Sequence, residues 1–420
     1  MLGIIATIFI LLCALIGVPL FIVLGIASLV CFSLFQIELS SIGIEMFRVA
    51  STPSLASIPL FTLAGYMLAE SHSPRRIIRL AKALCGHFPG GIAIVSLVVC
   101  AFFTAFTGAS GVTIIALGAL LYPVLREQNY SDMFSLGLLT TCGSLGLLFP
   151  PSLPLILYGV IAKVDIADLF KAGIVPGTVI MIVYALWAIK KGEKKDVEPF
   201  SWTEVRAAVR GGIWEVALPV VIAVGIYGGY ATVSEMSTLT VLYVFIVEFV
   251  VFRDLQVKKD LTRIIIDSMY LVGAILMILC LALGFTNFLV DQEIPLKVLV
   301  VMKQVFHNRY SLLLFFNVFL LVIGAMKDVF SAIIVVVPLI LPIAKEYDIH
   351  PVHMGIIFLT NLEIGYIAPP FGINLFIASA RFKRPIADVY RATWPFLILS
   401  FIALMIVTYI PFLSLMWIKQ

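Results

Sequence analysis

The stretch SLGLLFPPSLPLILYG, from Ser144 to Gly159, places three prolines inside an almost wholly apolar run. Proline has no backbone N–H and clashes with the preceding helical turn, so Pro150, Pro151 and Pro154 must interrupt a helix here. Such an interruption leaves backbone carbonyl and N–H groups without helical partners. The stretch therefore predicts a discontinuous helix, with backbone carbonyl and N–H groups at its centre that lack helical hydrogen-bond partners.

The composition of the whole chain is that of a membrane protein. Of its 420 residues, 62% are hydrophobic and 12% are charged, whereas a soluble domain is about half apolar and a quarter charged. Many apolar runs exceed about 18 residues, the length that spans a bilayer as a helix. The runs are continuous, without the alternation of a transmembrane barrel. We therefore expect an all-α polytopic membrane protein embedded in a lipid bilayer.

A second copy of the opening pattern occurs in the other half of the chain. Gly146–Pro151, GLLFPP, corresponds to Gly365–Pro370, GYIAPP, and Pro123 corresponds to Pro342. Transporters are often built from two halves, and inverted repeats leave weak internal symmetry of this kind. The sequence therefore predicts two inverted repeats, each with one broken helix.

Hydropathy predicts the remaining helices. Residues 1–35 carry no charge and lack the basic start and cleavage site of a signal peptide, so a retained membrane helix is expected there. Two segments, 91–124 and 311–343, have polar middles and are too short for two full spans, so we expect re-entrant hairpins. The expected membrane helices are 3–33, 53–70, 133–149 continuing to 161, 172–189, 213–230, 237–252, 264–288, 352–368 continuing to 380, and 392–417.

The basic residues predict the orientation of these helices. Cytoplasmic loops carry an excess of Lys and Arg. The excess falls in residues 74–90, 124–132, 189–212, 253–263 and 381–391. This distribution predicts the N-terminus inside, the C-terminus outside, and the two halves in opposite orientations.

Two matched breaks indicate a transport site. A single proline kink is common in membrane helices and is repaired by neighbouring groups. Breaks at equivalent places in both halves, Pro150-Pro151 and Pro369-Pro370, instead favour half-helix ends that bind anions and unwound carbonyls that bind cations.

The hairpin turns carry polar groups. In TAFTGASG, Thr104–Gly111, glycine permits a tight turn and the hydroxyls of Thr107 and Ser110 can serve a ligand or simply helix packing. In GAMKDVFS, Gly324–Ser331, Lys327 and Asp328 are either a neutralising pair at the membrane surface or mark an ion path, as charged groups within a membrane usually do.

Other chemistry is poorly supported. The five histidines do not form a zinc set, and GxxxxGK[ST] is absent, which excludes a P-loop ATPase motor. Asn361 is a candidate oxygen ligand, and Glu363 is either an ion or proton ligand or a surface residue. The Lys/Arg runs are typical of cytoplasmic anchors rather than of nucleic-acid contacts.

These motifs resemble the large membrane subunit of tripartite ATP-independent periplasmic (TRAP) transporters. The strongest similarity runs from Gly324 to Ser379 and includes the tip Asp328, PVHMG from Pro351, and PPFGIN from Pro369. The first half matches through GASG, Gly108–Gly111, and FPPS, Phe149–Ser152.

The resemblance implies a sodium-coupled secondary transporter, not an enzyme, in the bacterial cytoplasmic (inner) membrane. Its fold would be of the elevator type, in which a transport domain slides against a scaffold. It would carry a carboxylate such as a sugar acid or dicarboxylate, with Na⁺ as coupling ion and no organic cofactor. Its partners would be a small four-helix membrane subunit and a soluble extracytoplasmic substrate-binding protein.

The resemblance and the motifs together give a set of expected site residues and domains. We expect the substrate at Thr107, Gly108, Ala109, Asn361, Pro369 and Asn374. We expect sodium at Ser110, Gly111, Pro150, Ser152, Gly324, Asp328 and Gly372. The expected domains are scaffold helices 1–73 and 172–294, transport halves 74–171 and 295–391, and a C-terminal helix 392–420.

Two alternatives remain open at this point. A binding-protein-independent sodium/carboxylate symporter or exchanger would share the same fold. A channel would need a continuous pore, which the repeat and the re-entrant turns argue against.

Overall fold

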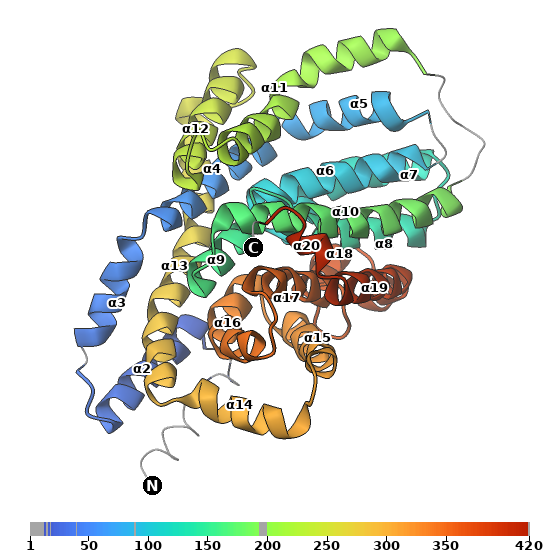
Figure 1. The fold of residues 1–420 in the computed structure, drawn as a ribbon. Coiled ribbons are helices and arrows are strands. Elements are labelled where there is room, and N and C mark those ends of the chain that lie inside the picture. The colour runs from blue at the N-terminus through green and yellow to red at the C-terminus, as the bar shows by residue number, and fades with distance from the viewer. Residues whose placement is uncertain are drawn as a thin grey trace.

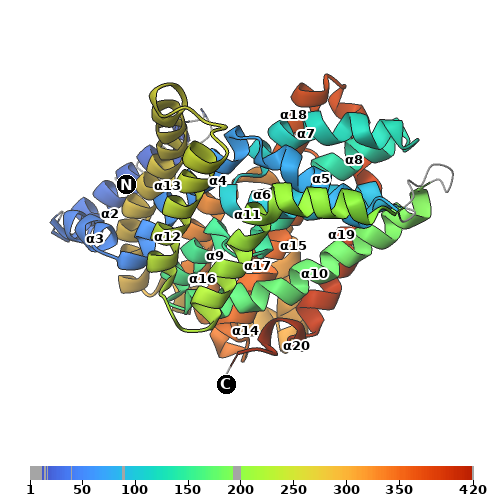
Figure 2. The same ribbon diagram turned by 90° about the horizontal axis from the view of Figure 1, so that it is seen from above.

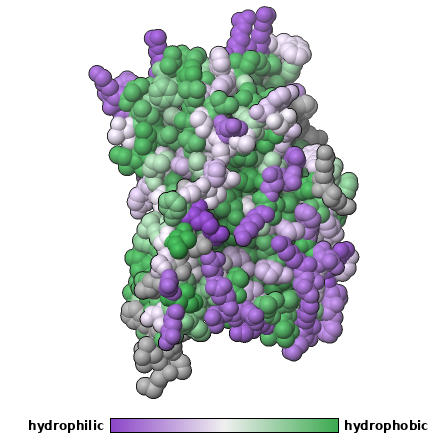
Figure 3. Space-filling view, turned by 60° about the vertical axis from the view of Figure 1, so that its left-hand side comes forward, coloured by the Kyte–Doolittle hydropathy of each residue, from purple (hydrophilic) through white to green (hydrophobic). Residues whose placement is uncertain are grey.

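The computed structural model describes residues 12–13, 16, 18–38, 40–87, 90–192 and 200–418, and these residues contain helices and no strand. Eight of the described helices are long and apolar enough to cross a membrane, or nine if one bent pair counts as a span. Figure 3 shows broad hydrophobic areas on the surface, and large exposed apolar side chains such as Leu186, Val224 and Val318 lie on the long helices. These faces are suited to lipid contact.

The N-terminal helices differ from expectation. Of the predicted helix 3–33, residues 3–11, 14, 15 and 17 lie outside the described residues, and Val18 and Pro19 are not helical before α2 begins. Proline at the N-cap ends the preceding turn, which explains the interruption. A further helix, α3, was not predicted. The bounds here are α2 Leu20–Leu34, α3 Ser40–Ala50, the 3₁₀ turn η1 Pro53–Ala56, and α4 Ser57–Glu70.

The first of the two similar halves follows. Its elements are α5 Ser73–Cys85, α6 Gly91–Thr107, α7 Ser110–Glu127, α8 Asp132–Cys142, η2 Leu145–Leu148 and α9 Leu153–Ala162. The segment 132–148 meets α9 at a bend of 42°, across the proline stretch with which the sequence analysis began. The expected broken helix is therefore present, with bounds one residue wider at each end.

A group of long helices separates the two halves. It comprises α10 Ile166–Lys191, α11 Trp202–Tyr227, α12 Val233–Phe245, the π-helical turns η3 Ile246–Val251 and η4 Val257–Leu261, and α13 Thr262–Asp291. Figure 1 shows α11 beside α5, and α13 beside α2 and α3, as the contacts between these elements also show. Helices α10 and α11 begin well before the predicted starts. Asp165 caps α10 and Ser201 caps α11, and the polar first turns that follow these caps lie outside the apolar runs that hydropathy detects.

The first five helices of the second half follow in the same order as α5–α9 of the first, without a counterpart of η2 among the described elements. The second half comprises α14 Ile294–Val305, α15 Arg309–Met326, α16 Val329–Glu346, α17 Pro351–Gly365, α18 Ile373–Phe382, α19 Ile386–Tyr409 and the short α20 Phe412–Leu415. Helix α19 begins six residues before the predicted 392, because its first turns carry charged residues such as Asp388 and Arg391 that hydropathy excludes. It ends at Tyr409, shortly before Pro411, which cannot continue the helix.

Local backbone geometry recurs at equivalent places in the two halves. Both Pro–Pro bonds, 150–151 and 369–370, are cis. Left-handed residues follow the two hairpins, at Asn129 and Asp348, and also end the two helices after the breaks, at Lys163 and Lys383. Ser144 and Glu363 occupy equivalent positions in the two halves, because the repeat is offset by 219 residues, and the Ser144 hydroxyl donates to the Glu363 carbonyl at 3.4 Å.

The two halves interlock through their hairpins. Helix α7, the second arm of the first hairpin, packs against α18, and α16, the second arm of the other hairpin, packs against α9. In Figure 2, α7 and α18 lie together at one edge of the molecule. Each hairpin therefore contacts the half-helix that follows the break of the opposite half, and this exchange places both turns and both breaks in one region.

Candidate transport site

The first hairpin turn is seated on the half-helix after the first break. Gly108 ends α6 with a φ of +63°, and a Cβ there would lie 2.8 Å from Cγ of Leu153. Its N–H donates to the Thr104 carbonyl at 2.8 Å. Thr107 is buried, and its hydroxyl accepts from the Ala109 N–H at 3.4 Å. A side chain at position 108 would separate the turn from α9, so this glycine is required by close approach as well as by backbone conformation.

Ser110 joins the first turn to the second broken helix. Its hydroxyl donates to Oδ1 of Asn374 at 2.7 Å, and Nδ2 of Asn374 donates to the Thr140 carbonyl at 3.3 Å. A Cβ on Gly111 would lie 2.6 Å from Cδ1 of Ile377. The structure thus brings together a residue expected at sodium and one expected at substrate, from opposite halves of the chain.

Ser152 caps the half-helix α9 at the first break. Its hydroxyl accepts from the Leu155 N–H at 3.5 Å and donates to the Leu147 carbonyl. Thr104 adds a second link, because its hydroxyl donates to the Gly143 carbonyl at 2.8 Å. Ser152 is buried and Pro150 is half-buried. Thr104 was not predicted as a site residue, although it lies four residues before Gly108 of the same turn, and this closeness is the signal in the sequence that points to it.

Asp328 caps the second arm of the second hairpin. Its Oδ1 accepts from the Ser331 N–H at 2.9 Å, and the side chain is half-buried, whereas Lys327 is exposed. The next N–H, that of Val329, donates to the Tyr366 hydroxyl at 2.7 Å. Tyr366 lies in the second break and was not predicted as a site residue. It ties that break to its own hairpin turn.

Backbone groups at the breaks are less free than the sequence analysis expected. At the second break, the N–H of Gly372 donates to Ala368 at 3.0 Å and that of Asn374 donates to Tyr366 at 3.1 Å. At the first, the Phe149 N–H donates to Gly146 at 3.1 Å. Tight local turns re-pair these N–H groups, so carbonyl oxygens and side chains are the groups that can take up an ion. Gly372 is buried and Pro369 is half-buried.

Asn361 lies in a buried polar network that faces α15 and α19. Its Nδ2 donates to Oδ1 of Asn317 and to the Ile357 carbonyl, both at 2.8 Å. Nδ2 of Asn317 donates to the Thr408 hydroxyl at 3.2 Å. The hydrogen bonds of Asn361 therefore run to helix partners rather than to the hairpin turns. Gly324 lies on the same side, and a Cβ there would be 2.9 Å from Cα of Leu362.

An ion-pair cluster, defined here as Arg76, Glu215, Glu248 and Asp254, fixes α5 to α11, to η3 and to the loop that follows η3. Arg76 binds Glu215 and Asp254, and bonds both oxygens of Glu248 at 2.8 and 2.9 Å. Burial alone would raise the pKa of the Asp254 carboxyl, but Arg76 and His72 outweigh burial and lower that pKa below its ordinary value.

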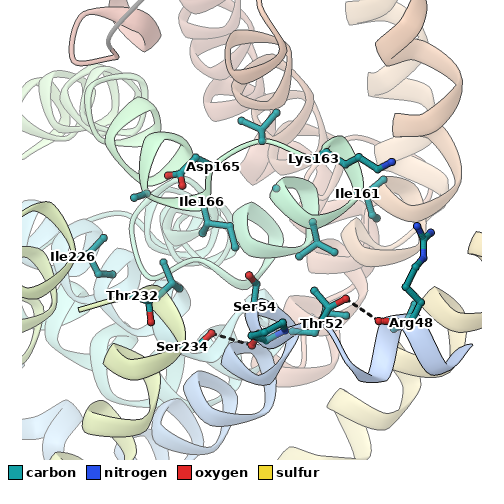
Figure 4. A pocket seen from close by; sticks show the side chains of 18 of the residues that line it. Arg48, Thr52, Ser54, Ile161, Lys163, Asp165, Ile166, Ile226, Thr232 and Ser234 are labelled. Atoms are coloured by element: carbon teal, nitrogen blue, oxygen red, sulfur yellow. Dashed lines mark hydrogen bonds between the residues drawn. The ribbon is translucent and has the colours of Figure 1, made fainter. Parts of the chain in front are cut away.

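A separate cavity of about 650 Å³ lies where α3, η1, the α9–α10 loop and the α11–α12 turn meet. Figure 4 shows Arg48 and Lys163 on one side of it and Thr232 and Ile226 on the other. The volume falls within the range of about 300–1,000 Å³ that is usual for small-molecule sites. This cavity was not predicted from the sequence, because its lining comes from four segments that are distant along the chain.

The comparisons with known proteins identify the family. Residues 7–413 match the family described as tripartite ATP-independent periplasmic transporter, DctM component. The chain belongs to the DctM family. It is therefore a transporter permease and not an enzyme, and the many apolar helices place it in the bacterial inner membrane.

DctM relatives match over nearly the whole chain. The C4-dicarboxylate TRAP transporter large permease of Rhodobacter capsulatus is 31% identical, over 95% of this chain and 94% of the relative. The ectoine TRAP transporter large permease of Halomonas elongata is 32% identical, over 96% and 95%. The isethionate TRAP transporter permease of Oleidesulfovibrio alaskensis is 31% identical over 94% of this chain, which spans 63% of that relative.

A solved structure shares the DctM fold. The YdaH transporter of Alcanivorax borkumensis superposes with a TM-score of 0.63 over 90% of this chain and 88% of that one, at 13% sequence identity. At this identity the likeness shows the fold alone, and it agrees with the all-α membrane architecture expected from the sequence.

Proposed function

We propose that this chain carries a small carboxylate-bearing solute into the cell together with Na⁺, by an elevator movement of the two hairpin-and-break units against the remaining helices. The observation that carries the proposal is the exchange between halves, in which Ser110 of one turn binds Asn374 of the opposite half-helix. This contact unites the two units into one body, and an elevator requires a body that can move as a whole.

The chemistry of the gathered groups supports sodium and a carboxylate. Hydroxyl, carbonyl and carboxylate oxygens are the ligands that hard cations prefer, and Ser110, Ser152 and Asp328 supply such oxygens at the turns and breaks. Half-helix N-termini, such as those of α9 and α18, favour an anionic group. Relatives named for C4-dicarboxylate, ectoine and isethionate support a small organic solute as substrate.

The partners follow from the tripartite family. We propose a separate small four-helix membrane subunit and a soluble extracytoplasmic binding protein that delivers the substrate. The helices before the first hairpin-and-break unit and those between the two units, α2–α4 and α10–α13, would form the scaffold. The large apolar side chains exposed on α11–α13 give that scaffold a surface for lipid or the small subunit.

The test is uptake of candidate acids into liposomes that contain this chain and its small subunit, with and without a sodium gradient and binding protein. Uptake that needs both the sodium gradient and the binding protein supports the proposal. Sodium-driven uptake without the binding protein indicates a symporter that works without a binding protein. Uptake that is independent of sodium refutes the coupling to Na⁺.

Asp328→Asn sharpens the sodium test. Asparagine caps a helix as well as aspartate does, so the α16 cap is kept while the charge is lost, and we expect loss of sodium-dependent uptake. Asp165→Asn is the matched control, because Asp165 also caps a helix, accepting from the Asp168 N–H at 3.0 Å, but is exposed. Equal sodium dependence in both variants would remove Asp328 from the site.

A further inference from the structure

Glu363 is a carboxylate without a partner in the interior of the protein. It lies in α17, is 3% exposed, and both of its carboxylate oxygens are buried without a hydrogen bond. Within the described ranges it is the one acidic side chain for which this holds for both oxygens. The proposed sodium and substrate sites do not use this group.

The surroundings of Glu363 offer no counter-charge. Helix α17 packs against α9, α10, α15, α16, α19, α20 and η2. Among the described residues of these elements, Tyr184 of α10 is the titratable group near enough to interact electrostatically with Glu363. Tyr184 also interacts with Cys142 of α8. The Tyr184 hydroxyl is paired with Ser400 of α19 and not with the carboxylate. An ionised carboxylate would thus be buried with neither a cation nor a hydrogen-bond donor.

An ionised carboxylate in such a place is strongly disfavoured, whereas a protonated one carries no charge to desolvate. Carboxylates inside membranes that escape this cost usually face a water-filled path or belong to a proton relay. The packed conformation therefore selects the neutral, protonated form of Glu363.

The position of Glu363 links it to both breaks. Its carbonyl accepts the Ser144 hydroxyl of the first break. It follows Leu362, whose Cα would lie 2.9 Å from a Cβ on Gly324 in the second hairpin. Tyr366, one turn further on, holds the second hairpin turn through Val329. A change of charge at Glu363 would therefore act where the two halves and the second hairpin meet.

We propose that Glu363 is a proton-binding site of the moving body. It holds a proton in the packed conformation and exchanges that proton with water when α10 and α17 separate during the transport cycle. The exchange rests on the proposed transport function, whereas the bound proton does not.

The bound proton is tested without transport, by infrared spectroscopy of the purified chain at neutral pH. A protonated carboxyl gives a C=O stretching band that a carboxylate lacks. We expect a band that disappears in Glu363→Gln and persists in Glu346→Gln, the control in which an exposed acid paired with Lys303 is replaced. If Glu363→Gln does not fold, Glu363→Asp must shift the band. Absence of any band that depends on position 363 overturns the proposal.

The exchange is tested by the pH dependence of sodium-driven uptake. We expect the uptake rate of the unaltered protein to change between mildly acidic and mildly alkaline pH, and that of Glu363→Gln to be independent of pH while still requiring sodium. A Glu363→Gln variant with the unaltered pH profile overturns the exchange. If the unaltered protein shows no sodium-driven uptake, the proposed function fails while the infrared result still stands.

Discussion

Replacing Arg76 by alanine would leave three carboxylates without the guanidinium that they share. The side chains of Glu215 and Glu248 are 1% and 0% exposed, so water cannot take the place of the lost charge. Removing one partner of a buried ion pair costs about 3–5 kcal/mol, whereas an exposed pair is worth about 0–1 kcal/mol. We expect Arg76→Ala to lower the free energy of unfolding by the larger amount.

The measurement is equilibrium unfolding in mixed lipid–detergent micelles, followed by circular dichroism. Arg263→Ala is the matched control, since Arg263 pairs with Glu70 at 2.7 Å but the two side chains are 58% and 45% exposed. The reasoning is refuted if the two arginine variants cost the same.

A second substitution checks the cause of the loss. Adding Glu248→Gln to Arg76→Ala removes one of the stranded charges, so part of the lost stability should return. The pH supplies a further check through Asp254. Because its pKa is lowered in the folded protein, its contribution is present above the ordinary carboxyl pKa and is lost as the pH falls through the lowered value.

Two further substitutions test packing and the contact between halves. Gly365→Ala would place a Cβ 2.6 Å from Cα of Gly324, so we expect it to lower the free energy of unfolding by about 1–3 kcal/mol. In the control Gly273→Ala, the added Cβ meets nothing within 4 Å, so we expect no loss. Equal free energies of unfolding for the two variants would contradict the close packing at Gly365. Ser110→Ala leaves the buried Oδ1 of Asn374 without its hydrogen-bond donor, so we expect the free energy of unfolding to fall by about 1–3 kcal/mol. A double-mutant cycle with Asn374→Ala should show that the two losses are coupled. Losses that add within about 0.3–0.5 kcal/mol would exclude this hydrogen bond.

The helices and their breaks could be predicted because their causes are local. Long apolar runs predicted the spans, Pro150-Pro151 and Pro369-Pro370 predicted the breaks, and the polar middles of 91–124 and 311–343 predicted a break between two helices in each segment. The failures were also local. The polar first turns of α10, α11 and α19 lie outside the apolar runs that hydropathy detects, and Pro19 interrupted a helix that hydropathy alone had drawn as continuous.

The sequence by itself determined the membrane class, the broken helices and the resemblance to a transporter family, because hydropathy and proline act on the residues that carry them. Only the tertiary structure decided that Ser110 meets Asn374, that Arg76 gathers three carboxylates, and that Glu363 is buried without a partner. These facts depend on which helices pack together, and residues separated by half the chain become neighbours only when the whole apolar core closes. No local pattern can report the burial of a carboxylate, because burial is a property of what surrounds it.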